Sequence, residues 1–410
     1  MSEEKPNVPK LRFPGFTDPW EQRKALHLAS YSKGKGYSKD DLTESGTPVI
    51  LYGRLYTKYE SVIEEVDTFV DASNDGIYSH GDEVIVPASG ETAEDIARAS
   101  AVAQPGVLLG GDLNILRPNK SITSLFMALS LSNGTAQKEL SKRAQGKSVV
   151  HVHNSDIQDV TISYPTIDEQ TQIGAFFRSL DSLITLHQRK LDHLKEMKKG
   201  LLQKMFPKNG ESIPELRFPG FADPWEQRKL GEIAEIVGGG TPNTSVEEYW
   251  DGDIDWYTPA ELGDRRYVDS SLRKITQAGY DNSSARMLPA NRTILFTSRA
   301  GIGNTAILCS SACTNQGFQS LVVGDSADVD FIYSLSDDIK RKAEIKASGS
   351  TFLEISGKRL TEIEVLAPAL VEQVQIGSFF RQLDSLIALH QRKLDHLKQM
   401  KKGLLQQMFV

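Results

Sequence analysis

The chain of 410 residues has little cysteine and no long apolar run. Its two cysteines, Cys309 and Cys313, are four positions apart, without a second pair or a histidine cluster beside them. A zinc site needs more ligands, so buried thiols are the simpler interpretation. No apolar run approaches the roughly 20 residues that span a bilayer, and the beginning MSEEKPNVPK lacks a signal-peptide core. We therefore expect a cytoplasmic protein.

Complete motifs of cofactor chemistry are also absent. A phosphate-binding loop that ends at Gly146-Lys147-Ser148 would need glycine at position 141, which is Ser141. The dinucleotide fingerprint is incomplete after Gly301-Ile302-Gly303, and the histidines give no metal triad. No Asp-Pro-Pro-Tyr or Asn-Pro-Pro-Phe type motif of amino methyltransferases occurs. These absences predict a chain that is not an enzyme by itself and that binds no cofactor or metal.

The dominant feature that is present is a segment that occurs twice. Residues 169–206 return as residues 372–409, with a constant offset of 203 and six differences. Both copies lack proline, are rich in Leu, Gln, Lys and Arg, and place apolar residues at alternating steps of three and four. This pattern predicts a long helix that packs on a partner helix. At about 1.5 Å per residue each helix is on the order of 55 Å long.

The apolar residues at alternating steps of three and four define the predicted helix seam. The near-identity of the two copies suits a surface that meets two copies of one partner. The seam and docking residues are Ile173, Phe177, Leu180, Ile184, His187, Leu191 and Leu194, and then Ile376, Phe380, Leu383, Ile387, His390, Leu394 and Leu397. The histidines, with Lys198 and Lys401, interrupt the apolar seam at equivalent places, so we expect them to fix helix register or to receive a partner helix. Gly200 and Gly403 each weaken the helix by about 1 kcal/mol and are interpreted as a bend or a close helix contact.

A second repeat precedes each half of the chain. Residues 11–24, LRFPGFTDPWEQRK, return as residues 216–229 with a single change. Two prolines and a glycine preclude a regular helix, while two phenylalanines and a tryptophan supply apolar anchors. We predict an extended docking segment that packs on something common to both halves.

Between these repeats lie two fillings of similar length and unlike sequence. Short β-like runs, such as residues 47–52 and 293–297, alternate with glycine turns, and each filling contains a helical piece, near residues 121–130 and 329–347. The predicted fold class is therefore α+β, with two mixed α/β domains and two long helices. The predicted divisions are 1–24 (tail and docking segment), 25–168 (first domain), 169–208 (long helix), 209–229 (repeated docking segment), 230–371 (second domain) and 372–410 (C-terminal long helix).

Charge is uneven along the chain. Residues 25–165 carry 12 Lys and Arg against 18 Asp and Glu, and residues 230–368 carry 13 against 20, whereas both long helices are basic. Overall acidity argues against an indiscriminate polyanion binder. Selective DNA binding would use Arg, Lys and polar side chains to contact bases, and cations and main-chain amides to contact phosphates. The candidates are Lys33, Lys35, Arg54, Lys58, Lys142, Arg143 and Lys147 in the first filling, and Arg265, Arg266, Arg273, Lys274, Arg286, Arg299 and Gln316 in the second.

The repeated openings and helices, the variable fillings and the turn Gly-Ser-Thr-Phe at residues 349–352 together resemble the specificity subunit (HsdS) of type I restriction-modification systems. The first half departs from the family pattern at residues 146–150, GKSVV. The resemblance implies two target recognition domains that each read half of a bipartite double-stranded DNA site. It also implies a pseudo-twofold repeat whose long helices pack as an antiparallel coiled coil and set the spacing of the half-sites.

The same resemblance implies partners and cofactors. Two methyltransferase subunits (HsdM) would bind S-adenosylmethionine and methylate adenine at N6, and motor and nuclease subunits (HsdR), which use ATP and Mg, would join for restriction. From the residues alone, two other hypotheses stay open: a coiled-coil scaffold whose acidic fillings bind proteins, and a stand-alone nuclease or methyltransferase. The missing motifs disfavour the latter.

Overall fold

The computed structural model describes residues 7–72, 75–146, 148–208, 210–263, 265–299, 301–348 and 353–410. The chain divides into two compact units, one of residues 1–189 and 391–410 and the other of residues 190–390. Each unit therefore contains one globular domain and one part of each long helix. We call residues 21–164 domain 1 and residues 226–367 domain 2. No helix in the described ranges is long and apolar enough to cross a bilayer.

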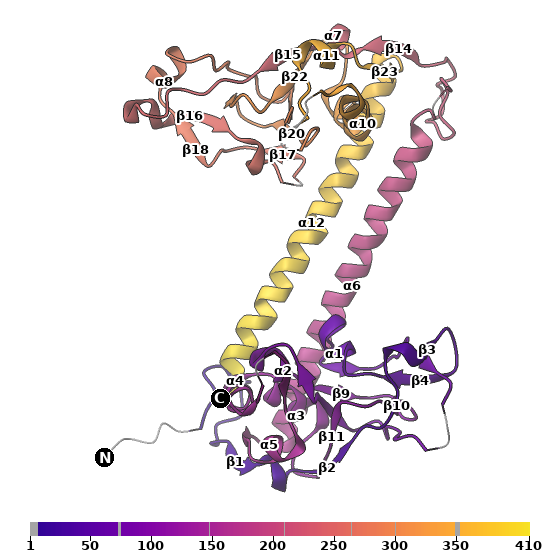
Figure 1. Ribbon diagram of the computed structural model, residues 1–410, viewed down its shortest axis with the longest axis vertical. Coiled ribbons are helices and arrows are strands. Elements are labelled where there is room, and N and C mark those ends of the chain that lie inside the picture. Colours follow the sequence, from indigo (N-terminus) through magenta and orange to yellow (C-terminus); the bar gives the residue numbers. More distant parts are fainter. Residues whose placement is uncertain are drawn as a thin grey trace. The chain divides into compact units, whose positions relative to one another are not determined.

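Domain 1 is built on a five-stranded sheet, and Figure 1 shows its helices gathered beside this sheet. The sheet order is β2 (Ala29–Lys33), β11 (Leu113–Pro118), β7 (Val84–Pro87), β9 (Ser100–Val102) and β5 (Val62–Ile63). A second sheet has the order β10 (Leu108–Leu109), β4 (Thr47–Ile50), β6 (Phe69–Val70) and β3 (Leu42–Thr43), and β8 (Ser89–Gly90) pairs with β12 (Val150–His151). The helices are α1 (Arg54–Thr57), α2 (Ala93–Ile96), α3 (Ser124–Leu131), α4 (Gly134–Arg143) and α5 (Asn154–Gln158), with single turns at Ala25–His27 and Lys39–Asp41.

Domain 2 repeats this plan with different residues. Its five-stranded sheet has the order β15 (Ala234–Gly238), β22 (Gln319–Val323), β19 (Thr293–Phe296), β20 (Thr305–Leu308) and β17 (Tyr267–Val268), and its second sheet has the order β18 (Arg273–Ile275), β16 (Trp250–Tyr257) and β21 (Cys313–Thr314). The helices are α7 (Leu230–Ile233), α8 (Gln277–Asp281), α9 (Val329–Ser334), α10 (Ser336–Lys346) and α11 (Gly357–Thr361), with single turns at Glu247–Tyr249 and Pro259–Glu261. In both five-stranded sheets the pairs are antiparallel except the last, which is parallel.

The strands arise where the sequence predicts them, because the β-branched runs at residues 47–50, 84–87, 293–296 and 305–308 supply side chains that fill a buried sheet. The helical piece predicted at residues 329–347 is divided at Leu335, where α9 ends and α10 begins. The family-like turn at residues 349–352 lies outside the described residues, as does Lys147.

The two long helices are α6 (Ile167–Met205) and α12 (Leu370–Met408). In the first unit Phe177 of α6 meets Phe409 just beyond α12, with ring centroids 6.2 Å apart, and Asp181 pairs with Lys401 at 2.5 Å. Residue numbers fall on α12 as they rise on α6, so the helices run antiparallel. In the second unit Phe206 meets Phe380 at 6.0 Å and Lys198 pairs with Asp384 at 2.6 Å, which repeats the arrangement.

Most of the predicted seam residues are buried. Ile173, Phe177, Leu180, Leu191, Leu194, Ile376, Phe380, Leu383 and Leu394 are buried, while Ile184, Ile387 and Leu397 are half-buried against the cores, and His187 and His390 are half-buried. Gly200 and Gly403 are not close helix contacts, because a Cβ at either position would meet nothing within 4 Å.

The repeated docking segments pack on the helix pair. In the first unit Phe13 packs on Phe176 of α6, with centroids 5.7 Å apart, and Trp20 packs on Phe409. In the second unit Phe218 packs on Phe379 of α12 and Trp225 packs on Phe206. The last four residues of each segment form a strand that joins its domain: β1 (Glu21–Lys24) pairs with β13 (Thr161–Tyr164), and β14 (Glu226–Lys229) pairs with β23 (Glu364–Ala367).

A bidentate ion pair fixes each docking segment to the first turn of a long helix. Arg12 donates to both carboxylate oxygens of Glu169, at 2.6 and 2.7 Å, and Arg217 donates to both oxygens of Glu372, at 2.7 Å each. The two glutamates are almost fully buried. We call each of these ion pairs, Arg12–Glu169 and Arg217–Glu372, a latch. Because both partners belong to the repeats, the latch is the same in the two units while the domains differ.

Candidate nucleic-acid interface

A cluster of loops in domain 2 brings several predicted DNA-binding residues together. The loop after β15, Gly238-Gly239-Gly240-Thr241, packs on the turn at Asn315–Gly317, where Gly240 N–H donates to the Thr314 carbonyl at 2.8 Å. Thr241 Oγ1 donates to Gln316 Oε1 at 2.6 Å. On the other side of this turn, Ser298 N–H donates to the Gly317 carbonyl at 2.8 Å, which joins the residue before Arg299 to the residue after Gln316. Gln316 and Arg299 are both exposed.

Glycine is required in the loop because the backbones approach too closely for a side chain. A Cβ at Gly239 would lie 2.0 Å from the Asn315 carbonyl oxygen, and one at Gly240 would lie 2.4 Å from the Ala285 nitrogen. These distances are far inside van der Waals contact, so only glycine fits at these two positions.

Arg273 is linked to the glycine loop through two tryptophans. Its guanidinium carbon lies 3.8 Å from the ring centroid of Trp250 and 5.7 Å from that of Trp256, while the residue remains exposed. The Trp256 indole N–H donates to the Gly240 carbonyl at 2.8 Å, which ties this stack to the glycine loop. A guanidinium held against an aromatic face keeps its N–H edges available and loses little freedom when it binds.

Domain 1 has a loop at the same place in its topology. The loop after β2, Gly34-Lys35-Gly36, packs on Gly110-Gly111, which follows β10. Lys35 N–H donates to the Leu109 carbonyl at 3.1 Å, and a Cβ at Gly34 would lie 1.8 Å from the Gly110 oxygen. Lys33, the last residue of β2, and Lys35 in the loop are both exposed, and Lys35 is ion-paired with Asp75. The two domains thus offer different side chains from equivalent loops.

Most of the remaining candidates are held in ion pairs with carboxylates. Arg54 is buried and pairs with Asp67 at 2.5 Å and Glu60 at 2.8 Å, and Lys58 pairs with Asp67 at 2.7 Å. Arg143 pairs with Glu139 and Asp159 beside the exposed Lys142. In domain 2, Arg265 is exposed, Lys274 pairs with Asp255, Arg286 pairs with Glu235, and Arg266 is 7% exposed between two aspartates.

The ion pairs of Lys58 and Arg54 change the pKa of the carboxylate that they share. Lys58, and then Arg54, lower the pKa of Asp67 to about 2. Arg54 and Arg266 are themselves buried and already paired with carboxylates, so neither belongs to the proposed DNA surface.

Thr241 and the tryptophans under Arg273 are site residues that the sequence did not single out. The glycine run at residues 238–240 indicates a turn in the sequence, but it does not by itself predict that Thr241 lies in a surface loop beside Gln316. Neither does the spacing of Trp250 and Trp256 say that both will face one arginine.

One group of possible metal ligands occurs in the described ranges, at His80, Asp82 and Glu83. Glu83 is fully buried, and its oxygens accept the amides of His80 and Gly81 at 2.8 and 3.1 Å and the Arg117 guanidinium at 3.3 Å. Burial alone would raise the pKa of Glu83, but these donors lower it. The carboxylate is saturated by protein donors, so the group fits a capped turn rather than a cation site.

Comparisons with protein-family models, sequences and solved structures show what this chain is similar to. The family model described as "Type I restriction modification DNA specificity domain" matches residues 17–196 and 222–399. The type I restriction enzyme MjaIX specificity subunit of Methanocaldococcus jannaschii is 35% identical over 190 residues, which cover 45% of this chain and 44% of that protein. The MjaVIII specificity subunit of the same organism is 22% identical over 416 residues, which cover 96% of this chain and 92% of that protein.

A solved structure with a similar fold is that of a type I restriction-modification system S subunit from M. genitalium. It has a TM-score of 0.66 and 16% sequence identity, and the match covers 98% of this chain and 99% of that one. This likeness, together with the paired domains and antiparallel helices, confirms the predicted fold class.

Proposed function

The chain belongs to the family of type I restriction modification DNA specificity domains, and on that premise we propose that it is the DNA sequence-recognition subunit of a type I restriction-modification complex. It is not catalytic by itself. Domain 1 reads one half of a bipartite DNA site and domain 2 reads the other, while the long helices set the spacing.

The observation that carries this proposal is a constant frame with two unlike loop surfaces. The five-stranded sheets have the same order and strand directions, and the docking segments and helices are nearly identical in sequence. At equivalent loops, however, domain 1 presents Lys33 and Lys35, and domain 2 presents Thr241, Gln316 and Arg299. Two readers of different sequences on one scaffold need this division between constant and variable parts.

The side chains of domain 2 suit base recognition. Gln pairs with the N6 and N7 edge of adenine and Arg with the O6 and N7 edge of guanine, so Gln316, Arg299 and Arg273 form a surface that can discriminate bases. The lysines of domain 1 suit phosphate contacts, which position a protein on DNA without specifying sequence.

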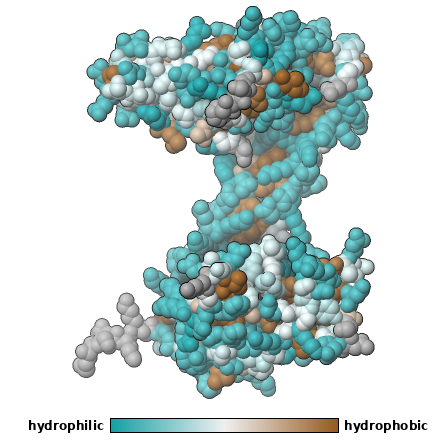
Figure 2. Space-filling model, in the orientation of Figure 1, coloured by the Kyte–Doolittle hydropathy of each residue, from teal (hydrophilic) through white to brown (hydrophobic). Residues whose placement is uncertain are grey.

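The long helices have a further exposed apolar surface that is duplicated. Leu183 and Leu186 are 46% and 62% exposed in the first unit, and Leu386 and Leu389, at the offset of 203, are 38% and 39% exposed in the second. Figure 2 shows apolar residues, in brown, among the hydrophilic residues of the long helices. We assign this surface to two methyltransferase subunits, because a partner present twice needs the same surface twice.

The complex would act in the cytoplasm, and its cofactors would be held by other chains. The methyltransferase subunits would bind S-adenosylmethionine for adenine N6 methylation, and the motor and nuclease subunits would use ATP and Mg for restriction.

Coexpression with the modification subunit tests the function directly. Single-molecule sequencing of the host DNA should show a new bipartite motif that carries N6-methyladenine in each half. Methylation at unrelated sequences, or none from an assembled and active complex, would refute the proposal.

A protein-binding scaffold is the second candidate, and the acidic balance of both domains favours it. A fluorescence titration of the complex with DNA separates the two. A sequence reader should prefer its own site, and its affinity should fall steeply with salt because phosphate contacts release counterions. A scaffold should show neither effect.

A further inference from the structure

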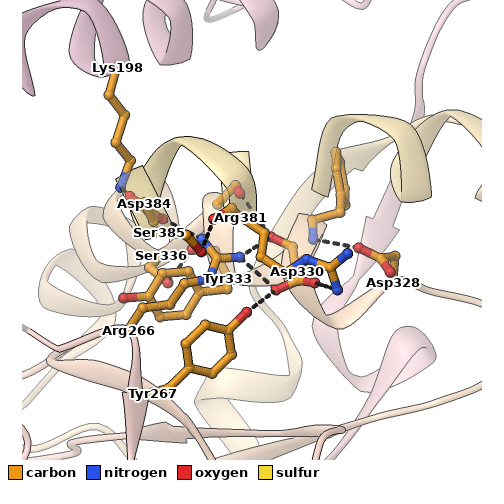
Figure 3. A network of polar contacts seen from close by, with 12 residues as sticks. Lys198, Arg266, Tyr267, Asp328, Asp330, Tyr333, Ser336, Arg381, Asp384 and Ser385 are labelled. Atoms are coloured by element: carbon orange, nitrogen blue, oxygen red, sulfur yellow. Dashed lines mark hydrogen bonds and ion pairs between the residues drawn. The ribbon is translucent and has the colours of Figure 1, made fainter. Parts of the chain in front are cut away.

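Domain 2 is joined to the long helices by a buried ionic network centred on Arg266, which Figure 3 shows between Asp330 and Asp384. Arg266 Nη2 donates to Asp330 Oδ1 at 2.7 Å, and Nη1 donates to the carboxylate of Asp384. Lys198 pairs with the other oxygen of Asp384 at 2.6 Å. The Arg266 side chain is 7% exposed, and Asp330 and Asp384 are 10% and 13% exposed.

The network joins four separate elements. Arg266 immediately precedes the edge strand β17, Asp330 belongs to α9, Asp384 to α12 and Lys198 to α6. The guanidinium also lies 4.4 Å from the ring centroid of Tyr333. Burial alone would lower the pKa of Arg266, but its hydrogen bond to Asp330 and the charge of Asp384 raise it. One charged side chain of the variable domain therefore contacts the constant helix pair and is itself buried there.

The first unit contains the same helix ion pair but a different residue facing it. Asp181 and Lys401, the repeat equivalents of Asp384 and Lys198, pair at 2.5 Å. Lys401 Nζ also lies 3.2 Å from Ser61 Oγ, and Ser61 immediately precedes the edge strand β5.

Ser61 and Arg266 occupy the same place in the two sheets. The Ser61 carbonyl accepts the amide of Ala101 on β9 at 3.0 Å, and the Arg266 carbonyl accepts the amide of Ile307 on β20 at 2.8 Å. Both bonds belong to the one parallel strand pair of each five-stranded sheet. The helices thus carry an identical Asp–Lys pair in each unit. Each domain contacts this pair with a different residue at the equivalent position.

We propose that the residue before the edge strand, Arg266 in domain 2 and Ser61 in domain 1, is a positioning residue that fixes the angle of its domain on the helix pair and thereby the spacer between the half-sites. This inference rests on the proposed function. One base pair is about 3.4 Å along the DNA axis, so a small tilt of a reading surface changes the preferred spacer. Arg266 holds domain 2 more firmly than Ser61 holds domain 1, because it makes charge-assisted bonds to two carboxylates.

The test measures spacer preference of the assembled complex on plasmids in which the wild-type half-sites are separated by spacers that change in steps of one base pair. Arg266→Ser combined with Asp330→Asn gives domain 2 the residue of domain 1 and leaves no unpaired carboxylate at position 330. Asp384→Asn is the second variant, because it weakens the contact to the helix and leaves the Arg266–Asp330 pair intact. Arg341→Ser, at an exposed arginine of α10, is the matched control.

We expect both network variants to recognise the same bases in each half-site as the wild type. Their methylation of sites whose spacer differs by one base pair from the wild-type spacer should rise about tenfold, which corresponds to about 1.4 kcal/mol. The control should keep the wild-type spacer. An unchanged spacer preference in both variants, with or without a fall in total methylation, would mean that the network is only structural and would overturn the proposal. A change in the recognised bases would instead make Arg266 a DNA reader. Failure of the proposed function itself is distinguishable, since the wild-type complex would then make no bipartite motif.

Discussion

The duplicated latch between docking segment and helix gives a prediction that carries its own internal control. Arg217→Met leaves the carboxylate of Glu372, which is 1% exposed, without the guanidinium that donates to both of its oxygens. Breaking a buried pair in this way costs about 3–5 kcal/mol. Glu372 lies in the first turn of α12, where the helix dipole offsets about 0.3–1 kcal/mol of that cost. We therefore expect a net loss of about 3 kcal/mol.

Hydrogen exchange of the full chain measures this loss locally. The Leu216 amide donates to the Lys204 carbonyl at 2.8 Å, so it reports opening of the second docking segment. A loss of about 3 kcal/mol should accelerate its exchange by about 150-fold. Adding Glu372→Gln to Arg217→Met should recover most of the loss, because the buried group is then neutral.

The repeat supplies the controls. Arg12→Met should have the same effect on the Leu11 amide, which donates to the Gln407 carbonyl at 3.0 Å, and should leave the Leu216 amide unchanged. Arg228→Met, which removes an exposed pair with Glu232, should cost less than about 1 kcal/mol. A loss below about 1 kcal/mol for Arg217→Met would refute the assignment of the latch as a buried ion pair that holds the segment.

Three further outcomes follow from the same structure. Leu194→Asp, in the buried seam, should cost several kcal/mol (about 3 or more) in urea unfolding, whereas Leu186→Asp, at 62% exposure, should leave stability unchanged and abolish capture of the modification subunit in a pull-down. Gly200→Ala should raise stability to urea by about 0.5–1 kcal/mol, because nothing lies within 4 Å of the added Cβ; a loss would indicate a contact there. The pKa of Asp67 is lowered from 3.8 to about 2, so its contribution to stability is complete above about pH 4 and is lost as the pH falls through 2. Asp67→Asn should therefore flatten the pH dependence of the urea midpoint in that window, and an unchanged slope would contradict the ion pairs with Lys58 and Arg54.

The long helices were predictable because their signal is local and repeated. Steps of three and four over many turns specify a buried face before any partner is known, and Phe177 and Leu194 lie on that face in the structure. The docking segment was predictable for a similar reason, since two phenylalanines and a tryptophan among prolines need an apolar surface to cover them. Strands such as β20 follow from short runs of β-branched and apolar residues.

Sequence patterns could not predict the edge strands or the burial of particular arginines. Strands β5 and β17 have two residues each, which is too short for any periodicity. Arg266 looks like its neighbour Arg265 in the sequence, yet its partner Asp384 is 118 positions away. Burial of a charge depends on which carboxylates the fold brings to it, and that information is distributed over the whole chain. The same holds for Arg273, whose stacking on Trp250 depends on the pairing of β16 with β18.

The central claim, that two unlike domains read two separate half-sites from one constant frame, is tested most directly by exchanging one domain. Residues 25–165 are replaced by the equivalent domain of a relative that recognises a different half-site, and the methylated motif is determined by single-molecule sequencing. One half of the motif should change to that of the donor, while the other half stays as in the wild type. A motif in which both halves change, or neither does, would contradict separate reading by the two domains.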